Sequence, residues 1–343
     1  MALKPVVIAL NASGLATAQK VAKVLGAQVH GREGRVAQAD AWFANALDHA
    51  RDLFAAGVPI VGVCASGILI RAVAPLLVDK TTEPPVVSVS DDGSVVVPLL
   101  GGHHGANRLA REIAQALGGV AAVTTAGDVS LGISLDEPPP GWALINPSDA
   151  KGVMSELLAG GGASVVGSDI KQATWLEGLP EGQNIRLTCS MEQAMDLGPT
   201  HLQFTPRRVT VGVGCARNCP PEEMEYLVRE TLNDAGICDA ALHSINTISL
   251  KADEPAILGL ATLLNAPLRL FSAEQLEAET PRLANPSDVV FAEVGCHGVS
   301  EAAALAQVGA NGKLFIAKRK TANATVALAI HDQPLLNYQG TPR

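Results

Sequence analysis

Two adjacent histidines in a glycine-rich loop are the side chains of this sequence best suited to chemistry. The stretch GGHHGAN places His103 and His104 among three glycines, Gly101, Gly102 and Gly105. Glycine lets a ligand approach the main chain closely, and imidazole gains or loses a proton near neutral pH. The loop therefore predicts a general acid or base. Two exposed imidazoles at the entrance of a helix are the alternative at this point.

Three other loops follow expected strands and hold polar or sulfur-bearing side chains. They are CASG (64–67), VGCARN (213–218) and VGCHGVSE (294–301). Doubly wound sheets bind ligands at the carboxyl ends of their strands, and we expect all four loops to lie there. The strand, glycine turn and helix start around Gly214 also predict a site for an anion. The third glycine of a dinucleotide fingerprint is missing, so a dinucleotide is not expected.

The cysteines and one acidic pair have structural explanations. Cys215 and Cys219 have no second pair of ligands to complete a zinc site, and Cys64 has no neighbouring base in the sequence. We therefore expect packed, reduced thiols at these positions. The pair of aspartates that begins at Asp91 precedes a glycine between two apolar runs, which indicates a hairpin turn.

Composition and charge narrow the class of protein. The chain has 343 residues, of which 48% are hydrophobic, and a net charge of −9. An acidic chain is a poor partner for nucleic acid, which needs a basic face. No run of 18 apolar residues offers a membrane span, and the apolar start reads as a first strand rather than a signal peptide. We expect a cytoplasmic protein that binds neither nucleic acid nor membrane.

Apolar periodicity predicts alternating strands and helices in the N-terminal third. The expected elements are a strand at 5–10, a helix at 15–26, a strand and turn at 57–67, a helix at 68–77, a hairpin at 84–100, a helix at 107–118, and a strand and turn at 120–128. This alternation is typical of a doubly wound sheet.

The C-terminal third repeats this pattern. A strand precedes a helix whose apolar face is formed by Met224, Leu227, Val228, Thr231, Leu232 and Ala235. Residues 245–276 and 300–330 supply further strands and helices. The fold class is thus α/β, with two doubly wound, mostly parallel domains at 1–135 and 205–332. They flank a small middle α/β segment at 136–204, and a loose tail at 333–343 follows.

Several long motifs resemble the CbiG family. The stretch from GILIRAVAPLL through GGHHGANRLAREIA (67–114), followed by VTTAGD (123–128), resembles the N-terminal domain of that family. The stretches VGVGC (211–215), ISLKADEPAILGLA (248–261), GVSEAAAL (298–305), KLFIAKRK (313–320) and ATVALAI (324–330) resemble its C-terminal domain, which is also found in CobE. The sequence departs from the family pattern at Arg217, where a second basic residue is missing, and at Glu83, where Asp is common.

The resemblance implies an enzyme of cobalamin synthesis, a cobalt-precorrin-5A hydrolase. Such an enzyme opens a δ-lactone on a cobalt corrinoid and releases acetaldehyde, which gives cobalt-precorrin-5B. The cobalt arrives inside the substrate, so no protein-bound metal or other cofactor is expected. The corrinoid is the expected partner; a homodimer and contacts with other enzymes of the pathway stay open.

Lactone hydrolysis needs a base, an acid and a stabiliser of the oxyanion. His103 and His104 are the expected catalytic residues. Since the corrinoid bears many carboxylates, basic side chains are expected to bind it. The expected substrate-binding residues are Arg71, Lys80, Gly101, Gly102, Gly105, Asn107, Arg108, Gly214, Cys215, Arg217, Ser300, Glu301 and Lys318.

Two other classes of function stay open at this stage. One is a corrinoid carrier without catalysis, similar to CobE, in which the histidines would not affect turnover. The other is a metal-dependent hydrolase of a different substrate that uses His103 or His104 together with His297, although adjacent histidines rarely bind one ion together.

Overall fold

The computed structural model describes residues 3–80, 82–193 and 197–336, apart from the side chain of His103. The chain divides into two compact units, Met1–Glu137 (unit 1) and Pro138–Arg343 (unit 2). The segments predicted as a middle section and a C-terminal domain both fall in unit 2, where each forms its own sheet. Within the described ranges, no helix has the length and apolar character needed to cross a membrane.

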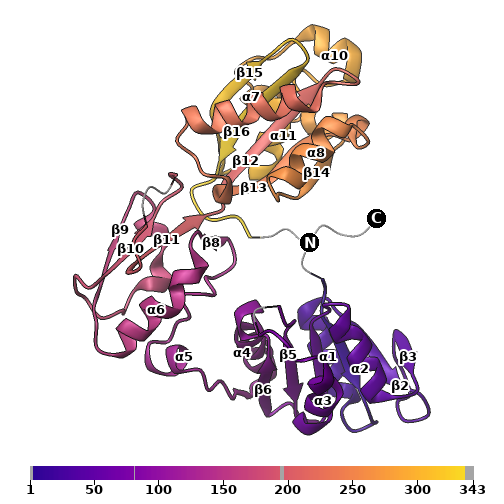
Figure 1. Cartoon of the computed structure of the whole chain (residues 1–343). Coiled ribbons are helices and arrows are strands. Elements are labelled where there is room, and N and C mark those ends of the chain that lie inside the picture. The colour runs from indigo at the N-terminus through magenta and orange to yellow at the C-terminus, as the bar shows by residue number, and fades with distance from the viewer. Residues whose placement is uncertain (1–2, 81, 194–196, 337–343) are drawn as a thin grey trace. The chain divides into compact units, whose positions relative to one another are not determined.

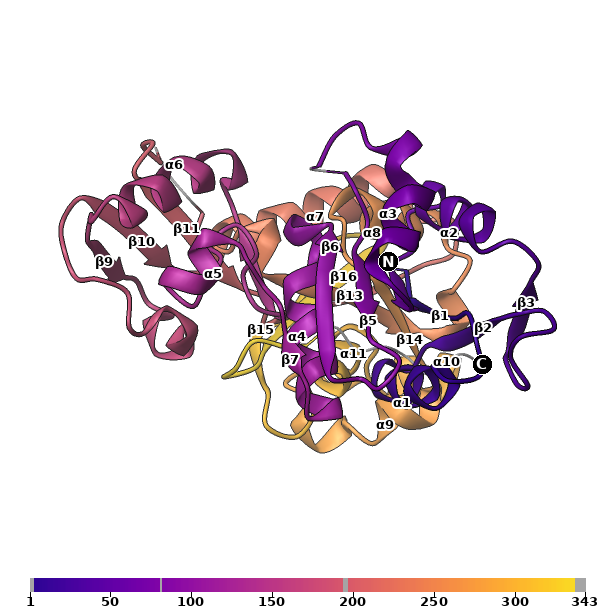
Figure 2. The same ribbon diagram turned by 90° about the horizontal axis from the view of Figure 1, so that it is seen from below.

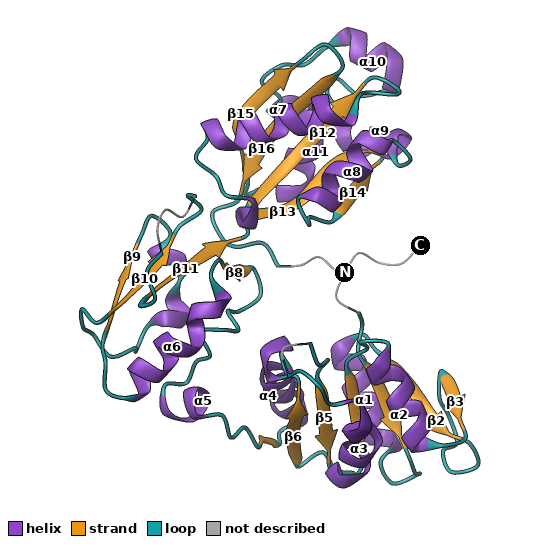
Figure 3. Ribbon diagram, viewed as in Figure 1, coloured by secondary structure: helices purple, strands orange, loops and turns teal. Residues whose placement is uncertain are grey.

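Unit 1 is built on one sheet of seven strands in the order β3-β2-β1-β4-β5-β6-β7 (Figure 3). Its strands are β1 (Val6–Ala9), β2 (Gln28–Arg32), β3 (Ala41–Phe43), β4 (Ile60–Val63), β5 (Val86–Val89), β6 (Val95–Leu100) and β7 (Val120–Ala121). Its helices are α1 (Leu15–Leu25), α2 (Ala46–Ala55), α3 (Ser66–Val73), η1 (Ala74–Leu76), η2 (Gly102–His104), α4 (Ala106–Leu117) and α5 (Ala126–Ser130).

The central strands of unit 1 are apolar throughout because helices cover both faces of the sheet. The strands β1, β4 and β5 read VVIA, IVGV and VVSV, and all their residues are buried. Helices α1 and α4 pack into one core cluster, and α2 and α3 pack into another. The elements β2, β3 and α2 occupy residues for which the sequence analysis assigned no structure.

Unit 2 holds a four-stranded sheet, β8-β11-β10-β9, and a five-stranded sheet, β14-β13-β12-β16-β15. The first contains β8 (Trp142–Leu144), β9 (Ala163–Val166), β10 (Ile185–Cys189) and β11 (His201–Pro206), with α6 (Pro147–Leu158), η3 (Ile170–Gln172) and η4 (Thr174–Leu176). Helix α6 lies along β10 and β11 in both views (Figures 1 and 2).

The five-stranded sheet follows in the chain. Its strands are β12 (Val209–Cys215), β13 (Leu242–Ile248), β14 (Leu268–Phe271), β15 (Lys313–Lys320) and β16 (Ala324–Ile330). Its helices are α7 (Pro221–Asp234), η5 (Asp239–Ala241), η6 (Ser249–Lys251), α8 (Pro255–Leu263), α9 (Ala273–Glu277), η7 (Thr280–Arg282), α10 (Asp288–Val294) and α11 (Ser300–Val308). Helices α7 and α8 share one core cluster with β12, whereas α11 packs into separate clusters.

Two predictions can be compared with these elements directly. The α/β class with mostly parallel sheets is confirmed, and five of the six residues expected on the apolar face of α7 are buried. At the described start of the expected tail, the main-chain N–H of Leu335 donates to the Arg207 carbonyl oxygen at 2.9 Å. Just before the tail, the Arg208 guanidinium donates to the carbonyl oxygens of His331 and Asp332.

Candidate functional site

The histidine loop does not lie where the sequence analysis placed it. Strand β6 runs antiparallel to β5, with Leu100 opposite Val86. The loop after β6 is therefore at the edge of the sheet where the parallel strands begin, which we call the amino edge. The CASG loop after β4 is at the opposite, carboxyl edge. The expectation that both loops meet at the carboxyl ends of strands is wrong because a single hairpin reverses the chain direction.

Glycine shapes the histidine loop in the way that its spacing predicts. Gly101 and Gly105 have φ angles of 73° and 97°, in the left-handed region that favours glycine. Between them, η2 is closed by hydrogen bonds from the main-chain N–H groups of His104 and Ala106 to the Gly101 carbonyl oxygen. The imidazole of His104 is exposed. The side chain of His103 lies outside the described set, so its predicted role stays a prediction.

Segments that are distant in the sequence meet at this amino edge. A Cβ atom on Gly101 would stand 2.6 Å from the carbonyl oxygen of Pro84, so the loop packs directly against the turn before β5. The same turn holds Lys80, which is exposed. Strand β7 is parallel to β6, and its end brings residues 122–128 to the same edge. These are the segments that carry the N-terminal family motifs.

Asn107 anchors the first turn of α4 instead of facing solvent. Its side chain is 8% exposed and donates to Asp128 Oδ2 at 2.8 Å and to Thr125 Oγ1 at 3.1 Å. Arg111 donates to Asp128 Oδ1 at 2.5 Å. Burial raises the pKa of Asp128, but hydrogen bonds from Thr125 and Arg111 outweigh burial and lower the pKa below its usual value. Asp128 thus holds α4 and α5 together, and Asn107 positions the loop.

Glu137 is a residue at this edge that the sequence analysis missed. Its Oε1 atom lies 3.5 Å from Nε of Arg108, and its side chain is 14% exposed. A Cβ atom on Gly105 would stand 3.1 Å from the same oxygen. Burial raises the pKa of Glu137 to about 7; Arg108 opposes this rise, and the carboxylates Asp128 and Asp136 add to it.

A carboxyl group with a pKa of about 7 can both give and accept a proton at neutral pH, which is the property expected of a general acid or base. The sequence around Glu137 reads DEPPPGW, and its prolines indicate only a boundary. No local signal could have revealed the burial that changes the chemistry of this side chain.

Arg71 is not part of the histidine-loop site. It lies on α3, which begins at the carboxyl edge, and its guanidinium donates to the Gly67 carbonyl oxygen at 2.9 Å in the first turn of that helix. Arg108 is half exposed, and with Lys80 it is one of the expected substrate-binding cations that the structure brings to the edge of the histidine loop. A Cβ atom on Gly102 would meet no described atom within 4 Å, so this glycine leaves open space at the loop.

In unit 2, the VGCARN loop closes around a buried carboxylate. Glu254 is 1% exposed and accepts from the main-chain N–H of Asn218 at 3.0 Å. Arg217 lies 2.7 Å from Asp253 and 3.6 Å from Glu254, and Lys251 lies 3.7 Å from Glu254. The charge of Arg217 is therefore already paired within the loop. This pairing weakens the expectation that it binds a substrate carboxylate.

Cys215 and the glycines before it are at least partly buried, whereas Ala216 and Asn218 are exposed. Burial raises the pKa of Cys215 to about 11, which keeps it a thiol at neutral pH. Gly214 accepts through its carbonyl oxygen from Thr325 at 3.1 Å. A Cβ atom on Gly212 would stand 1.8 Å from the carbonyl oxygen of Ser300, which is itself 2% exposed. These glycines let α11 approach β12, and the anion site expected at Gly214 stays a prediction.

Glu301 and Lys318 belong to a second closed cluster. Glu301 is 2% exposed and accepts from the main-chain N–H groups of Ala284, Asn285 and Lys318 at 2.8–2.9 Å. Burial raises its pKa, but these hydrogen bonds prevail and lower it. The Lys318 ammonium donates to the Asn285 carbonyl oxygen at 3.3 Å. Glu301 thus joins α11, β15 and the loop before α10, and its expected contact with substrate stays a prediction.

His297 is held by a carboxylate. Its Nδ1 lies 2.9 Å from Oε1 of Glu277, and its ring stacks on Phe291 with centroids 4.5 Å apart. Among the residues that the structure describes, no three His, Cys, Asp or Glu side chains form a group that could hold a metal ion.

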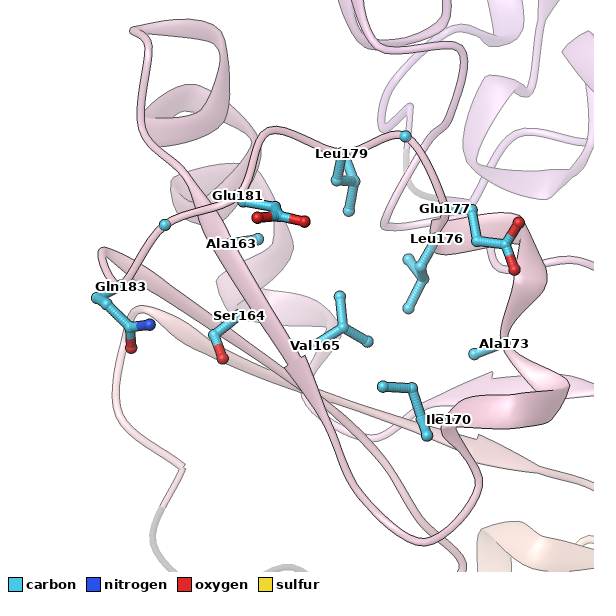
Figure 4. Close-up of a pocket in the computed structure, with 12 residues that line it drawn as sticks. Ala163, Ser164, Val165, Ile170, Ala173, Leu176, Glu177, Leu179, Glu181 and Gln183 are labelled. Carbon is cyan, nitrogen blue, oxygen red and sulfur yellow. The ribbon is translucent and has the colours of Figure 1, made fainter.

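A cavity of about 560 Å³ lies against β9 in unit 2. Figure 4 shows Val165, Ile170 and Leu176 converging on it, while Glu177 extends away from them and Glu181 lies at the rim. None of the described residues that line this cavity has a basic side chain. Its apolar floor and acidic rim therefore do not suit a ligand with many carboxylates.

Comparisons with known proteins agree with the motifs. The family models "Cobalamin synthesis G N-terminal" and "Cobalamin synthesis G C-terminus" match residues 48–128 and 209–329. Protein CobE of Sinorhizobium sp is 44% identical over 121 residues, which are 35% of this chain and 79% of that protein. The chain belongs to the CbiG family.

Other relatives of this CbiG chain extend over more of its length. A protein of Priestia megaterium named cobalt-precorrin-5A hydrolase is 29% identical over 301 residues, which are 81% of this chain and 80% of that protein. A solved structure of CobE, described as a protein from the cobalamin (vitamin B12) biosynthetic pathway, is 38% identical and covers 36% of this chain and 89% of its own, with a TM-score of 0.34.

Proposed function

We propose that this CbiG protein hydrolyses the δ-lactone of cobalt-precorrin-5A and releases acetaldehyde to give cobalt-precorrin-5B. The names of relatives that align with about four fifths of the chain support this function. The cobalt is part of the substrate in this proposal, and the protein works in the cytoplasm.

The observation that carries the proposal is the buried carboxyl of Glu137 beneath the histidine loop. In the hydrolysis, a water oxygen bonds to the lactone carbonyl carbon, the ring carbon–oxygen bond breaks, and the ring oxygen takes a proton to become a hydroxyl. Acetaldehyde then leaves when this hydroxyl gives up its proton and the bond between its carbon and the corrinoid breaks, with the electron pair staying on the corrinoid. His104 is exposed at the loop and Glu137 is buried below it, so one can take the proton of water while the other supplies a proton. Their order is part of the proposal.

The first turn of α4 supplies the stabiliser of the oxyanion that lactone hydrolysis needs. This helix begins at Ala106 without a side-chain cap. The N–H group of Ala106 already donates to the Gly101 carbonyl oxygen, which leaves the N–H groups of Asn107 and Arg108 without an intrahelical partner. Such groups stabilise an oxyanion. The half-exposed guanidinium of Arg108 is next to them and can bind a carboxylate of the corrinoid.

The test is anaerobic incubation with cobalt-precorrin-5A, with acetaldehyde trapped and the corrinoid spectrum followed. We expect acetaldehyde from the wild type and at least a roughly hundredfold loss in His104→Ala and Glu137→Gln with binding retained, which is the usual size of a general acid–base contribution. Glu112→Gln, an exposed change on α4, is the matched control and should keep full activity. Tight binding of the corrinoid without acetaldehyde from the wild type would overturn the hydrolase in favour of a carrier.

A further inference from the structure

A cavity at the carboxyl edge of unit 1 is not used by the proposed reaction. Its volume is about 520 Å³, within the usual range of small-molecule sites. It is lined by residues that follow β1, β4 and β5 and by the start of β6: Leu10, Asn11, Cys64, Ala65, Ser66, Ile68, Ser88, Ser90, Asp91, Val95 and Val97. It lies at the opposite edge of the sheet from the histidine loop.

The topology places this cavity at the switch point of the sheet. Strand β1 pairs with β2 on one side and with β4 on the other, all in parallel. Chain connections leave β1 and β4 in opposite directions, since α1 packs with one face of the sheet and α3 with the other. Open α/β sheets bind ligands in the crevice that opens at such a point.

One wall of the cavity is negative. Asp91 accepts from Ser13 Oγ at 2.5 Å and from Asn11 Nδ2 at 3.3 Å, both on its Oδ2 atom. Asn11 in turn accepts from the main-chain N–H of Gly14 at 2.9 Å and so serves the start of α1. This network fixes the carboxylate of Asp91 and uses one of its two oxygens. Among the described residues that line the cavity, Asp91 is the single one with a charged side chain.

The other wall is positive. Helix α3 begins at Ser66, and its N-cap Ala65 offers no side-chain hydrogen bond. The N–H group of Ile68 donates to the Ala65 carbonyl oxygen at 2.9 Å, so the N–H groups of Ser66 and Gly67 are the ones that lack a partner in the helix or its cap. These groups carry the positive end of the helix dipole. Arg71 adds a full charge nearby, since its guanidinium donates to Gly67 in the same first turn.

From these two walls we infer that the cavity binds a small molecule with a carboxylate at one end and a hydroxyl or ammonium donor at the other. The carboxylate accepts from the N–H groups at the start of α3, and the donor binds the second oxygen of Asp91. The apolar side chains Ile68, Val95 and Val97 contact the short carbon chain between the two ends. This inference does not rest on the proposed lactone chemistry, which belongs to the opposite edge.

Four small molecules test separately whether the carboxylate end and the donor end of the ligand contribute to binding. Lactate and alanine carry both a carboxylate and a donor, propionate has only the carboxylate, and propane-1,2-diol has only hydroxyl groups. Titration of the full chain, followed by NMR shifts of main-chain amides, should give saturable binding of lactate or alanine. Propionate and the diol should bind roughly tenfold more weakly, the loss expected for one charge-assisted hydrogen bond. Whichever of lactate and alanine binds better identifies the donor.

Substitutions in the protein test which end of the ligand binds Asp91 and which end binds the start of α3. Asp91→Asn should weaken lactate or alanine roughly tenfold and leave propionate unchanged. Ser66→Pro removes one main-chain N–H at the first helical position, where proline is tolerated, and should weaken the binding of all three carboxylate probes, lactate, alanine and propionate. Ser66→Ala keeps that N–H and is its control. Glu112→Gln removes an equal charge from an exposed position on α4, outside the lining of the cavity, and it should change nothing.

Equal binding of all four probes, or no saturable binding of any, would overturn the inference. The same holds if neither Asp91→Asn nor Ser66→Pro affects binding. Turnover of cobalt-precorrin-5A is measured in a separate assay. Failure of the inference about this cavity can therefore be told apart from failure of the proposed hydrolase function. His104→Ala should leave lactate and alanine binding unchanged, because the histidine loop lies at the other edge of the sheet.

Discussion

Replacing Glu137 with Gln should stabilise unit 1 at alkaline pH and much less at acid pH. Burial beside Gly105 raises the pKa of this carboxyl from its usual 4.5 to about 7. The folded state therefore disfavours the ionised form. The loss of stability that ionisation of Glu137 causes is absent below pH 4.5. It grows as the pH rises through the interval between the two pKa values and is complete above pH 7.

The size of the effect follows from the two pKa values. One pKa unit corresponds to about 1.4 kcal/mol, so ionised Glu137 costs unit 1 about 3 kcal/mol at high pH. Between pH 5 and pH 9, the stability difference between Glu137→Gln and the wild type should grow by about 2.5 kcal/mol. The change with pH is the quantity to compare, because packing differences between the two side chains are the same at both pH values.

The assay is urea unfolding followed through Trp42, the single tryptophan of residues 1–137. A background with Trp142→Phe and Trp175→Phe leaves Trp42 as the only tryptophan, so the fluorescence reports on unit 1. Glu112→Gln, an exposed carboxyl on α4, is the control and should change by less than about 0.5 kcal/mol over the same range. A stability difference for Glu137→Gln that stays constant from pH 5 to pH 9 would refute the argument that burial controls this carboxyl.

Two further predictions concern unit 2. Gly212→Ala should lower the free energy of unfolding by about 3 kcal/mol, because its methyl group would overlap the carbonyl oxygen of Ser300. The control is Gly259→Ala, in the interior of α8 with no described atom within 4 Å, which should raise the free energy of unfolding by about 0.5–1 kcal/mol. Equal effects of the two substitutions in denaturant titrations would contradict this packing. Arg208→Met should cost about 3–5 kcal/mol, because it leaves the fully buried carboxylate of Asp169, now 2.6 Å from the guanidinium, without its ion pair. Most of that loss should return when Asp169→Asn is added, and a double variant as unstable as the single one would argue against the pairing.

Local patterns were sufficient for much of the secondary structure. The apolar residues of α7 recur with helical spacing, and five of them are buried as expected. The hairpin of β5 and β6 follows from two apolar runs around an Asp-Asp-Gly turn. By contrast, β2, β3 and α2 lie in a stretch where polar and apolar residues follow neither period clearly, and no element was assigned there.

The candidate site was predicted only in part. The glycines around the histidines were correctly read as a special backbone, since Gly101 and Gly105 adopt positive φ angles. The basic residues were harder to judge, because Arg217 is paired with carboxylates that are more than 30 positions away in the sequence. Asp91 was interpreted as a turn residue, and only the folded sheet shows that it also lines a cavity.

The sequence by itself determined the α/β class, the periodic elements and the motifs that mark the family. These features depend on neighbouring residues or on short repeats, which one chain displays directly. The tertiary structure alone decided which edge of the sheet holds the histidine loop, because the direction of β6 depends on its pairing with β5. It also decided the chemistry of Glu137, since the pKa of a carboxyl depends on how deeply it is buried and on which charges surround it.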